Sequence, residues 1–168
     1  ISVAGQYAVA EAWDALHNGL HVLLFSDNVS IEDEIALKRY AIQHRLLMMG
    51  ADCGTAIING VALGFANAVP RGPVGIVAAA GTGLQEVSTL LAKLGAGISQ
   101  GIGTGGRDMK EQVGGIMMLE GIRALQTDPQ TRALLLVSKP PSPTVTERVL
   151  DQVKRSDKPA VVCFLGGD

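Results

Sequence analysis

Short runs of consecutive apolar residues alternate with segments of helical periodicity along most of the chain. The apolar runs predict β-strands at His21–Ser26, Leu46–Gly50, Val74–Ala79, Gly97–Ile102, Ala133–Ser138 and Ala160–Leu165. The periodic segments predict helices at Ser30–Arg45, Thr82–Leu94, Gln112–Gln126 and Pro143–Arg155, after an alanine-rich helix that ends near Gly19. Continuous rather than alternating apolar strands are typical of a parallel sheet that helices cover on both faces. The pattern therefore predicts an α/β fold.

Two of the predicted helices carry clear start signals. Ser30 is a good N-cap, and the acidic run Glu32–Glu34 after it suits a solvated first turn. Ser142 before Pro143 marks the second start. The apolar periodicity of the first helix predicts that its core face consists of Ile31, Ile35 and Ile42.

The segment Ala51–Gly72 interrupts the alternation of strands and helices. It is too apolar to stay solvated as a flexible linker. We therefore expect an ordered connection between two units, one on each side of it.

Composition narrows the class of protein. Of the 168 residues, 47% are hydrophobic and 18% charged, with a formal net charge of −2, so a sizeable core can form. Neither a basic patch for nucleic acid nor a cluster for a membrane surface is present. The two cysteines, Cys53 and Cys163, lack metal-ligand or redox spacing and are expected to be buried thiols, with lining of the cleft as the alternative for Cys53 beside its glycine turn. The sequence thus predicts a cytoplasmic protein without a metal site.

Two glycine-rich loops follow predicted strands, "AAAGTGLQE" at Ala78–Glu86 and "GIGTGGRD" at Gly101–Asp108. Glycines let a backbone approach an anion, and free amides at the start of a helix donate to it. Candidate phosphate-binding residues are Gly81, Thr82, Gly83, Gly103, Thr104, Gly105 and Gly106. Tight packing explains such loops as well as a ligand does, and both interpretations stay open. Arg107 and Asp108 either form a surface pair, which we favour, or reach a ligand.

Longer motifs connect these loops to a known family. "MGADCGTAIING", "RGPVGIVAAAGTGLQEV", "GIGTGGRD" and "DPQTRALLLVSKPPSP" resemble the α subunit of succinyl-CoA synthetase and its acyl-CoA synthetase relatives. Among these, "ISVAGQYA", "LLFSDNVSIEDEIALK" and "SKPPSP" are similar to FdrA-type proteins along essentially the whole chain. The resemblance implies the C-terminal half of a Rossmann-like CoA-binding domain at 1–55, the connection at 56–72 and a flavodoxin-like ligase domain at 73–168.

The resemblance also assigns candidate residues. "SVAG" and "LFSDNVS" match strand ends beside the cofactor, which implies CoA contacts by Ser2, Val3, Ser26, Asp27 and Asn28. "AGTG" matches the family's phosphate loop at Gly81 and Thr82, whereas Ala80 replaces a serine there. "DCG" matches an Asn-Cys/Thr-Pro turn, with Asp52 and Gly54 departing from it.

Two departures concern the family's phosphohistidine. Its catalytic histidine sits in a Gly-His-Ala-Gly loop, and none of His17, His21 or His44 has that context. Where the family has a glutamate that holds the phosphohistidine, this chain has Lys139, a candidate anion contact.

The resemblance implies an NDP-forming acyl-CoA synthetase that takes CoA and a small carboxylate or acyl phosphate. A nucleoside triphosphate with Mg²⁺ would be bound by another domain or subunit, and a homo-oligomer or a β-like subunit is the expected partner. The alternatives are a carbamoyl-phosphate-dependent transferase subunit of the oxamate carbamoyltransferase type and a non-catalytic scaffold that binds CoA or a nucleotide.

Overall fold

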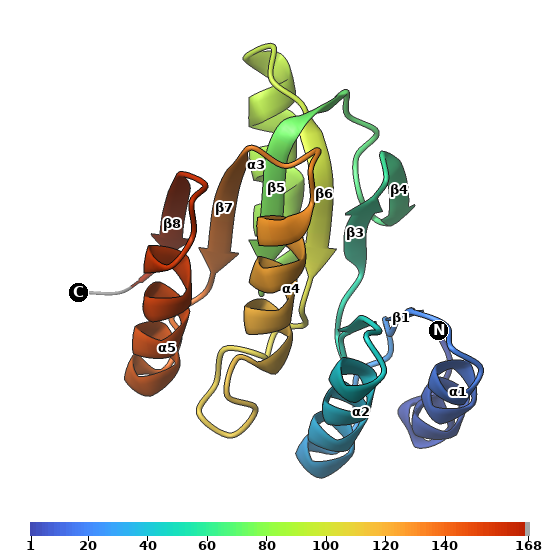
Figure 1. Ribbon diagram of the computed structural model, residues 1–168. Helices are drawn as coiled ribbons and strands as arrows, with labels where there is room; N and C mark the ends of the chain where they lie inside the picture. Colours follow the sequence, from blue (N-terminus) through green and yellow to red (C-terminus); the bar gives the residue numbers. More distant parts are fainter. Residues whose placement is uncertain (167–168) are drawn as a thin grey trace.

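The computed structural model describes residues 1–166 of the chain as a mixed α/β fold with two sheets (Figure 1). The smaller sheet has two strands and lies with the first two helices at one end of the molecule. The larger sheet has six strands in the order β4-β3-β6-β5-β7-β8. The predicted α/β class is confirmed.

The first unit consists of α1 (Gly5–His17), β1 (Val22–Leu23), α2 (Ile31–Gln43) and β2 (Met48–Met49). The two strands are parallel and much shorter than the predicted ones. The Ser30 hydroxyl accepts a hydrogen bond from the Asp33 amide at 3.0 Å, which confirms the predicted N-cap. Left-handed Gly19, with φ of 72°, follows α1 as expected.

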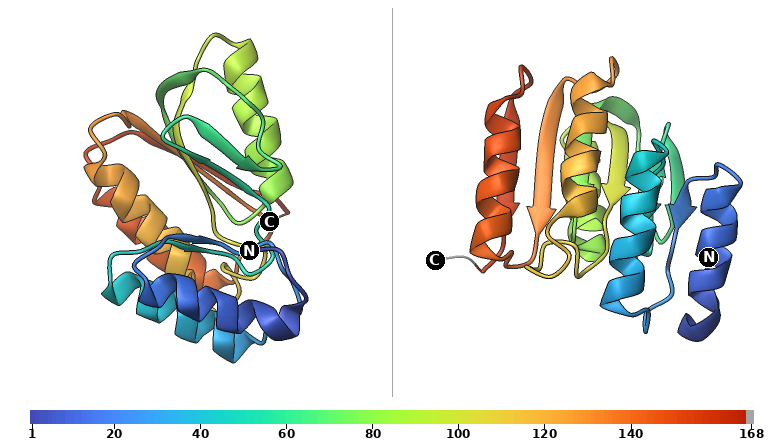
Figure 2. Two further views of the ribbon diagram at one scale, coloured as in Figure 1. Left: turned by 90° about the vertical axis from the view of Figure 1, so that its right-hand side faces the viewer. Right: turned by 60° about the horizontal axis from the view of Figure 1, so that its bottom comes forward.

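The larger sheet is built from β3 (Thr55–Ile58), β4 (Val61–Gly64), β5 (Arg71–Ala78), β6 (Ile98–Gly103), β7 (Ala133–Ser138) and β8 (Ala160–Phe164). β6, β5, β7 and β8 run parallel, as predicted. The helices are α3 (Gly81–Lys93), α4 (Ile116–Thr127) and α5 (Pro143–Lys154). Figure 2 shows α3 on one face of this sheet and α4 and α5 on the other.

The segment expected to be a connection is a β-hairpin that completes the sheet. β3 pairs antiparallel with β4 and with β6, so the sheet is mixed rather than purely parallel. The hairpin turns at Asn59 and Gly60, both left-handed with φ of 52° and 80°. Asn-Gly is the preferred pair for such a two-residue turn, so the signal was present in the sequence.

Two helix details differ from the prediction. α4 begins at Ile116 instead of Gln112, because Gly114 and Gly115 adopt φ of 77° and 70° and cannot continue a right-handed helix. At α5, Ser142 is the N-cap residue, but its buried hydroxyl has no hydrogen-bond partner within residues 1–166.

The buried face of α2 is the main error of the sequence analysis. Ile31, Ile35 and Ile42 are only half-buried. The side that faces the protein carries Glu34, Leu37, Lys38 and Ala41 instead. Glu34 thus does not belong to a solvated first turn. The buried face differs from the predicted one because Glu34 and Lys38 form ion pairs inside the molecule, as described below.

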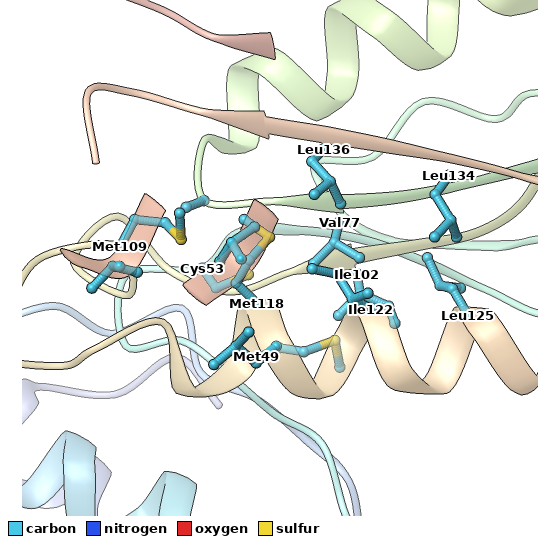
Figure 3. Close-up of a cluster of buried hydrophobic side chains, with 14 of the residues drawn as sticks. Met49, Cys53, Val77, Ile102, Met109, Met118, Ile122, Leu125, Leu134 and Leu136 are labelled. Carbon is cyan, nitrogen blue, oxygen red and sulfur yellow. The ribbon is translucent and has the colours of Figure 1, made fainter. Parts of the chain in front are cut away.

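The largest core cluster lies between the six-stranded sheet and α4 (Figure 3). Cys53 is part of it at 4% exposure, as expected. Cys163 is exposed, contrary to the prediction, because it lies on edge strand β8 beside exposed Val161 and Leu165.

None of the helices described in residues 1–166 is both long enough and apolar enough to cross a membrane.

Candidate functional site

The carboxyl ends of β5 and β6 meet at a hollow of about 220 Å³. β5 pairs with β6 on one side and β7 on the other, while α3 and α4 lie on opposite faces. Ligands of open α/β sheets bind at such a reversal of strand order. This glycine hollow is lined by Asp52, Cys53, Gly54, Ala78, Ala79, Ala80, Gly81, Thr82, Gln85, Gly103, Gly105, Gly106 and Lys139.

The first glycine loop, Ala79–Gly83, presents the start of α3 to the glycine hollow. Gly81 and Thr82 are exposed there, and both line the hollow. Within residues 1–166 no acceptor is found for the amides of Gly81, Thr82 and Gly83. Free amides at a helix start, reinforced by the helix dipole, attract an anion. Gly83 does not line the glycine hollow. It packs against β7 instead, where a Cβ would lie 2.8 Å from the Val137 side chain.

The second glycine loop, Gly103–Gly106, is packed against the segment that joins the two units. A Cβ on Gly103 would lie 2.5 Å from the Cys53 sulfur, and one on Gly105 would lie 2.3 Å from the Ala51 oxygen. Thr104 is fully buried and does not line the hollow. Two of the predicted phosphate-binding glycines are therefore required by packing, whatever else they do.

Lys139 borders the glycine hollow from the end of β7 and is exposed. The structure thus places it where an anion contact was predicted. Gln85 and Asp52 were not predicted: the Gln85 amide donates to the Thr55 hydroxyl at 2.9 Å, and Asp52 adds a carboxylate. A carboxylate opposes anion binding, so an anion in this hollow would depend on Lys139 and the α3 amides to outweigh Asp52.

A second hollow of about 320 Å³ gathers most of the predicted CoA contacts. This serine hollow is lined by Ser2, Val3, Ala4, Phe25, Ser26, Asp27 and Asp52. Ala4 is also the N-cap residue of α1, so a helix start borders this hollow too. Asp52 lines both hollows, which therefore adjoin each other.

Ser26 and Asn28 have local partners that limit what they offer a ligand. The Ser26 hydroxyl donates to the Val3 carbonyl at 2.6 Å and accepts from the Val3 amide at 3.0 Å. Ser26 therefore ties the segment after β1 to the segment before α1. Asn28 does not line the serine hollow, and its amide donates to the Asp27 carboxylate at 2.8 Å.

Cys53 lies in the wall of the glycine hollow, beneath the second loop. Burial raises the pKa of its thiol, and the opposing effects of nearby backbone hydrogen bonds and of Lys38 are smaller. The neutral thiol is a poor nucleophile, so we assign Cys53 a packing role.

A buried group of charged side chains, here called the charge cluster, lies behind the second loop. It consists of Glu34, Lys38, Arg107 and Asp108. The expectation that Arg107 and Asp108 form a surface pair is wrong, because Asp108 is fully buried and Arg107 is half-buried. The spacing of Glu34, Leu37, Lys38 and Ala41 along one helix face was the signal in the sequence.

The histidines lie away from both hollows. His17 and His44 stack on Trp13 and Tyr40 between α1 and α2, and His21 accepts from the Leu47 amide. None of the three histidines lines either hollow.

No grouping of three or more potential metal ligands from His, Cys, Asp and Glu occurs in the part of the chain that the structure describes.

Sequence comparison finds similar proteins along almost the entire chain, although no family model matches. The uncharacterized protein YahF of Escherichia coli is 59% identical over 98% of this chain. The α subunit 1 of ADP-forming succinate–CoA ligase from Archaeoglobus fulgidus and the malate–CoA ligase α subunit of Methylorubrum extorquens are each 27% identical, over 99% and 98%. The chain spans 32% of YahF and 57% of each ligase subunit.

Solved structures share the fold at lower identity. ATP citrate lyase from Methanothrix soehngenii, in complex with citrate and coenzyme A, superimposes with a TM-score of 0.78 at 16% identity. It covers 98% of this chain, which spans 28% of that protein. The dinucleotide-forming acetyl-coenzyme A synthetase 1 of Candidatus Korarchaeum cryptofilum gives a TM-score of 0.75 at 18% identity, covering 99% of this chain and 37% of its own. Along nearly its whole length the chain is thus similar in sequence to α subunits of CoA ligases, and it shares its fold with these two solved structures.

Proposed function

We propose that this chain forms the CoA-binding and phosphate-binding part of an NDP-forming acyl-CoA ligase of the succinyl-CoA synthetase α type. One observation carries the proposal: the glycine hollow and the serine hollow adjoin at Asp52, and a helix start borders each. A thiol bound in one hollow would thus be close to a phosphate or acyl phosphate bound in the other.

In this proposal the glycine hollow binds the phosphoryl group. The amides of Gly81 and Thr82 donate to its oxygens, and Lys139 adds a positive charge at the edge. Preorganised donors of this kind stabilise charge that develops during acyl or phosphoryl transfer. The Thr82 hydroxyl is a further donor on the same turn. Gly103 and Gly105 are buried and line the hollow, and in this proposal they contribute backbone groups to it.

The serine hollow takes part of the CoA molecule. Ser2, Val3 and Asp27 supply its polar atoms, and exposed Phe25 supplies an apolar wall. Ser26 acts through Val3, whose backbone it holds at both polar groups. The Asp27 carboxylate accepts hydrogen bonds from hydroxyl or amide groups of the cofactor.

The remaining parts of the activity belong to the complete protein. We propose that residues 1–55 contribute to a CoA-binding domain and residues 73–168 to a ligase domain. The nucleotide with Mg²⁺ is assigned to another domain or to a β-like subunit. Several relatives carry names that mark them as α subunits, which supports such a partner.

Lys139 favours one alternative function. A lysine here binds the phosphate of carbamoyl phosphate or a small carboxylate directly, without a phosphohistidine. The alternative is a carbamoyl-phosphate-dependent transferase subunit.

Calorimetric titration of the full-length protein with CoA, phosphate and carbamoyl phosphate tests both functions. We expect CoA and phosphate each to bind, and mutual competition between phosphate and carbamoyl phosphate. Binding of carbamoyl phosphate without any binding of CoA would favour the alternative. Binding of CoA without formation of an acyl-CoA from any carboxylate, nucleotide and CoA would indicate a non-catalytic scaffold.

A further inference from the structure

The charge cluster buries three charged side chains completely and a fourth in part. The side chains of Glu34, Lys38 and Asp108 are all 0% exposed, and that of Arg107 is 35% exposed. Two positive and two negative groups make it formally neutral. Ionised groups are buried at a large desolvation penalty, and apolar residues of similar volume often stabilise a core equally well. The arrangement of the cluster therefore needs an explanation other than stability.

Lys38 holds the beginning of the second glycine loop. Its ammonium group donates to Glu34 Oε1 at 2.6 Å, to Asp108 Oδ1 at 2.7 Å and to the Thr104 carbonyl at 3.0 Å. These three acceptors use all three of its protons. The lysine of the first unit thus fixes the backbone immediately before Gly105.

Asp108 holds the other end of the same loop. In addition to Lys38, its carboxylate accepts hydrogen bonds from the amides of Met117 at 3.1 Å and Met118 at 2.8 Å. These amides lie in the first turn of α4, whose N-cap residue Gly115 has no side chain to offer. The carboxylate therefore takes the place of a cap and ties the loop to a rigid helix.

Arg107 extends the cluster to the serine hollow. Its guanidinium lies 2.8 Å from Glu34 Oε2 and donates to the Val29 carbonyl at 2.9 Å. Val29 follows closely on Asp27, which lines that hollow. The cluster therefore contacts the chain beside both hollows.

We propose that Glu34, Lys38 and Asp108 are positioning residues for the anion that binds in the glycine hollow. They clamp Gly105 and Gly106 from both ends, so that the loop keeps its shape before a ligand arrives. Two adjacent glycines have the largest backbone freedom of any pair of residues, and fixing them in advance lowers the entropy lost on binding. The inference rests on the proposed phosphate site.

The decisive variant is Glu34→Leu combined with Lys38→Met in the full-length protein. It removes one negative and one positive charge together, so it leaves the cluster neutral, and it releases the Thr104 carbonyl. We expect a fold close to the original and phosphate binding weaker by tenfold or more, with a more unfavourable binding entropy in calorimetry. Binding of CoA alone should change less than threefold, because the Ser26–Val3 hydrogen bonds remain.

Two further proteins separate positioning from general stability. Asp108→Asn keeps the shape of the side chain and removes its charge, and it too should weaken phosphate binding. Ile98→Ala opens a cavity at the other end of β6, where Ile98 is 1% exposed, and should lower the unfolding temperature without affecting phosphate affinity.

The outcomes are distinct. Weaker phosphate binding in both cluster variants and not in Ile98→Ala supports the positioning role. Phosphate binding as tight as in the unaltered protein, in either cluster variant that folds, overturns it and leaves the proposed function standing. If the unaltered protein binds neither phosphate nor CoA, the proposed function and the positioning role are both wrong.

Discussion

The two glycine loops look alike in the sequence and differ in the structure. Gly81 in the first loop is exposed, and a Cβ there would meet only Thr55, at 3.2 Å. Gly105 in the second loop is buried, left-handed and in contact with the backbone of Ala51. The first loop is open to a ligand, whereas the second is a packed wall that borders the same hollow. A glycine-rich loop at a strand end therefore has two separate uses, and only the surroundings distinguish them.

The largest effect expected from this comparison is on stability. Gly105→Ala should destabilise the fold by about 3 kcal/mol, since it adds both a backbone strain and an overpacked atom. Gly95→Ala is the matched control, because Gly95 has a similar φ of 79° and no atom within 4 Å of a new Cβ. Urea denaturation of both variants measures the difference. Equal losses would show that the close approach to Ala51 adds nothing.

Gly81→Val should show the opposite profile. A Cβ at this position would lie 3.2 Å from the Thr55 hydroxyl oxygen, a contact that the threonine must relieve by a small shift, so we expect a stability loss of about 1 kcal/mol. The branched side chain covers the free amides of the α3 start, and the phosphate dissociation constant should rise at least tenfold. Calorimetry and urea denaturation of the same sample measure the two effects. Unchanged phosphate affinity would make the first loop a packing turn like the second.

Lys139→Glu probes the charge at the edge of the first loop. Reversing an exposed charge near an anion should weaken phosphate binding by about 1 kcal/mol, since water screens it. Lys154→Glu changes the net charge equally on α5, where the lysine side chain is 74% exposed and does not line the hollow. A phosphate titration at low salt compares the two. If both variants lost similar phosphate affinity, Lys139 would act only through the net charge of the protein.

The smallest effect concerns Cys53, beneath the second loop. Burial raises the pKa of its thiol above the ordinary 9.0, so the unfolded chain releases this proton first as the pH rises. The stability that the neutral thiol contributes is present below pH 9.0 and is lost as the pH rises through the raised pKa. Urea denaturation at pH 7 and pH 10 should show a smaller loss in Cys53→Ala than in the original protein. An identical loss in both would argue that the second loop does not shield this thiol.

Much of the fold follows from local sequence signals. Parallel strands β5 to β8 read as continuous apolar runs, and β7 has the predicted bounds, Ala133–Ser138. The N-cap of α2 was equally clear, because Ser30 and the acidic residues after it act within one turn. The carboxyl-end rule also brought Gly81 and Lys139 to one hollow, although they are far apart in the chain.

The errors have a common cause in long-range contacts. An i, i+4 pair such as Glu34 and Lys38 is ordinarily a solvent-exposed pair, and its burial here depends on distant partners such as Asp108, seventy residues after Lys38. The packing of Gly105 likewise depends on Ala51. The hairpin at Asn59-Gly60 is different, because its turn signal is local, whereas the apolar composition of the whole segment favoured an ordered connection.

The shortness of β1 and β2 has a consequence for the amide hydrogens of the first unit. Each strand has two residues, and within residues 1–166 their sheet has no third strand. Such a small ladder opens readily, so its amides should exchange with deuterated water far faster than those of β5, which is paired on both sides. The candidate CoA contacts adjoin this ladder. A bound cofactor should therefore slow exchange most in β1 and β2, and leave β5 almost unchanged.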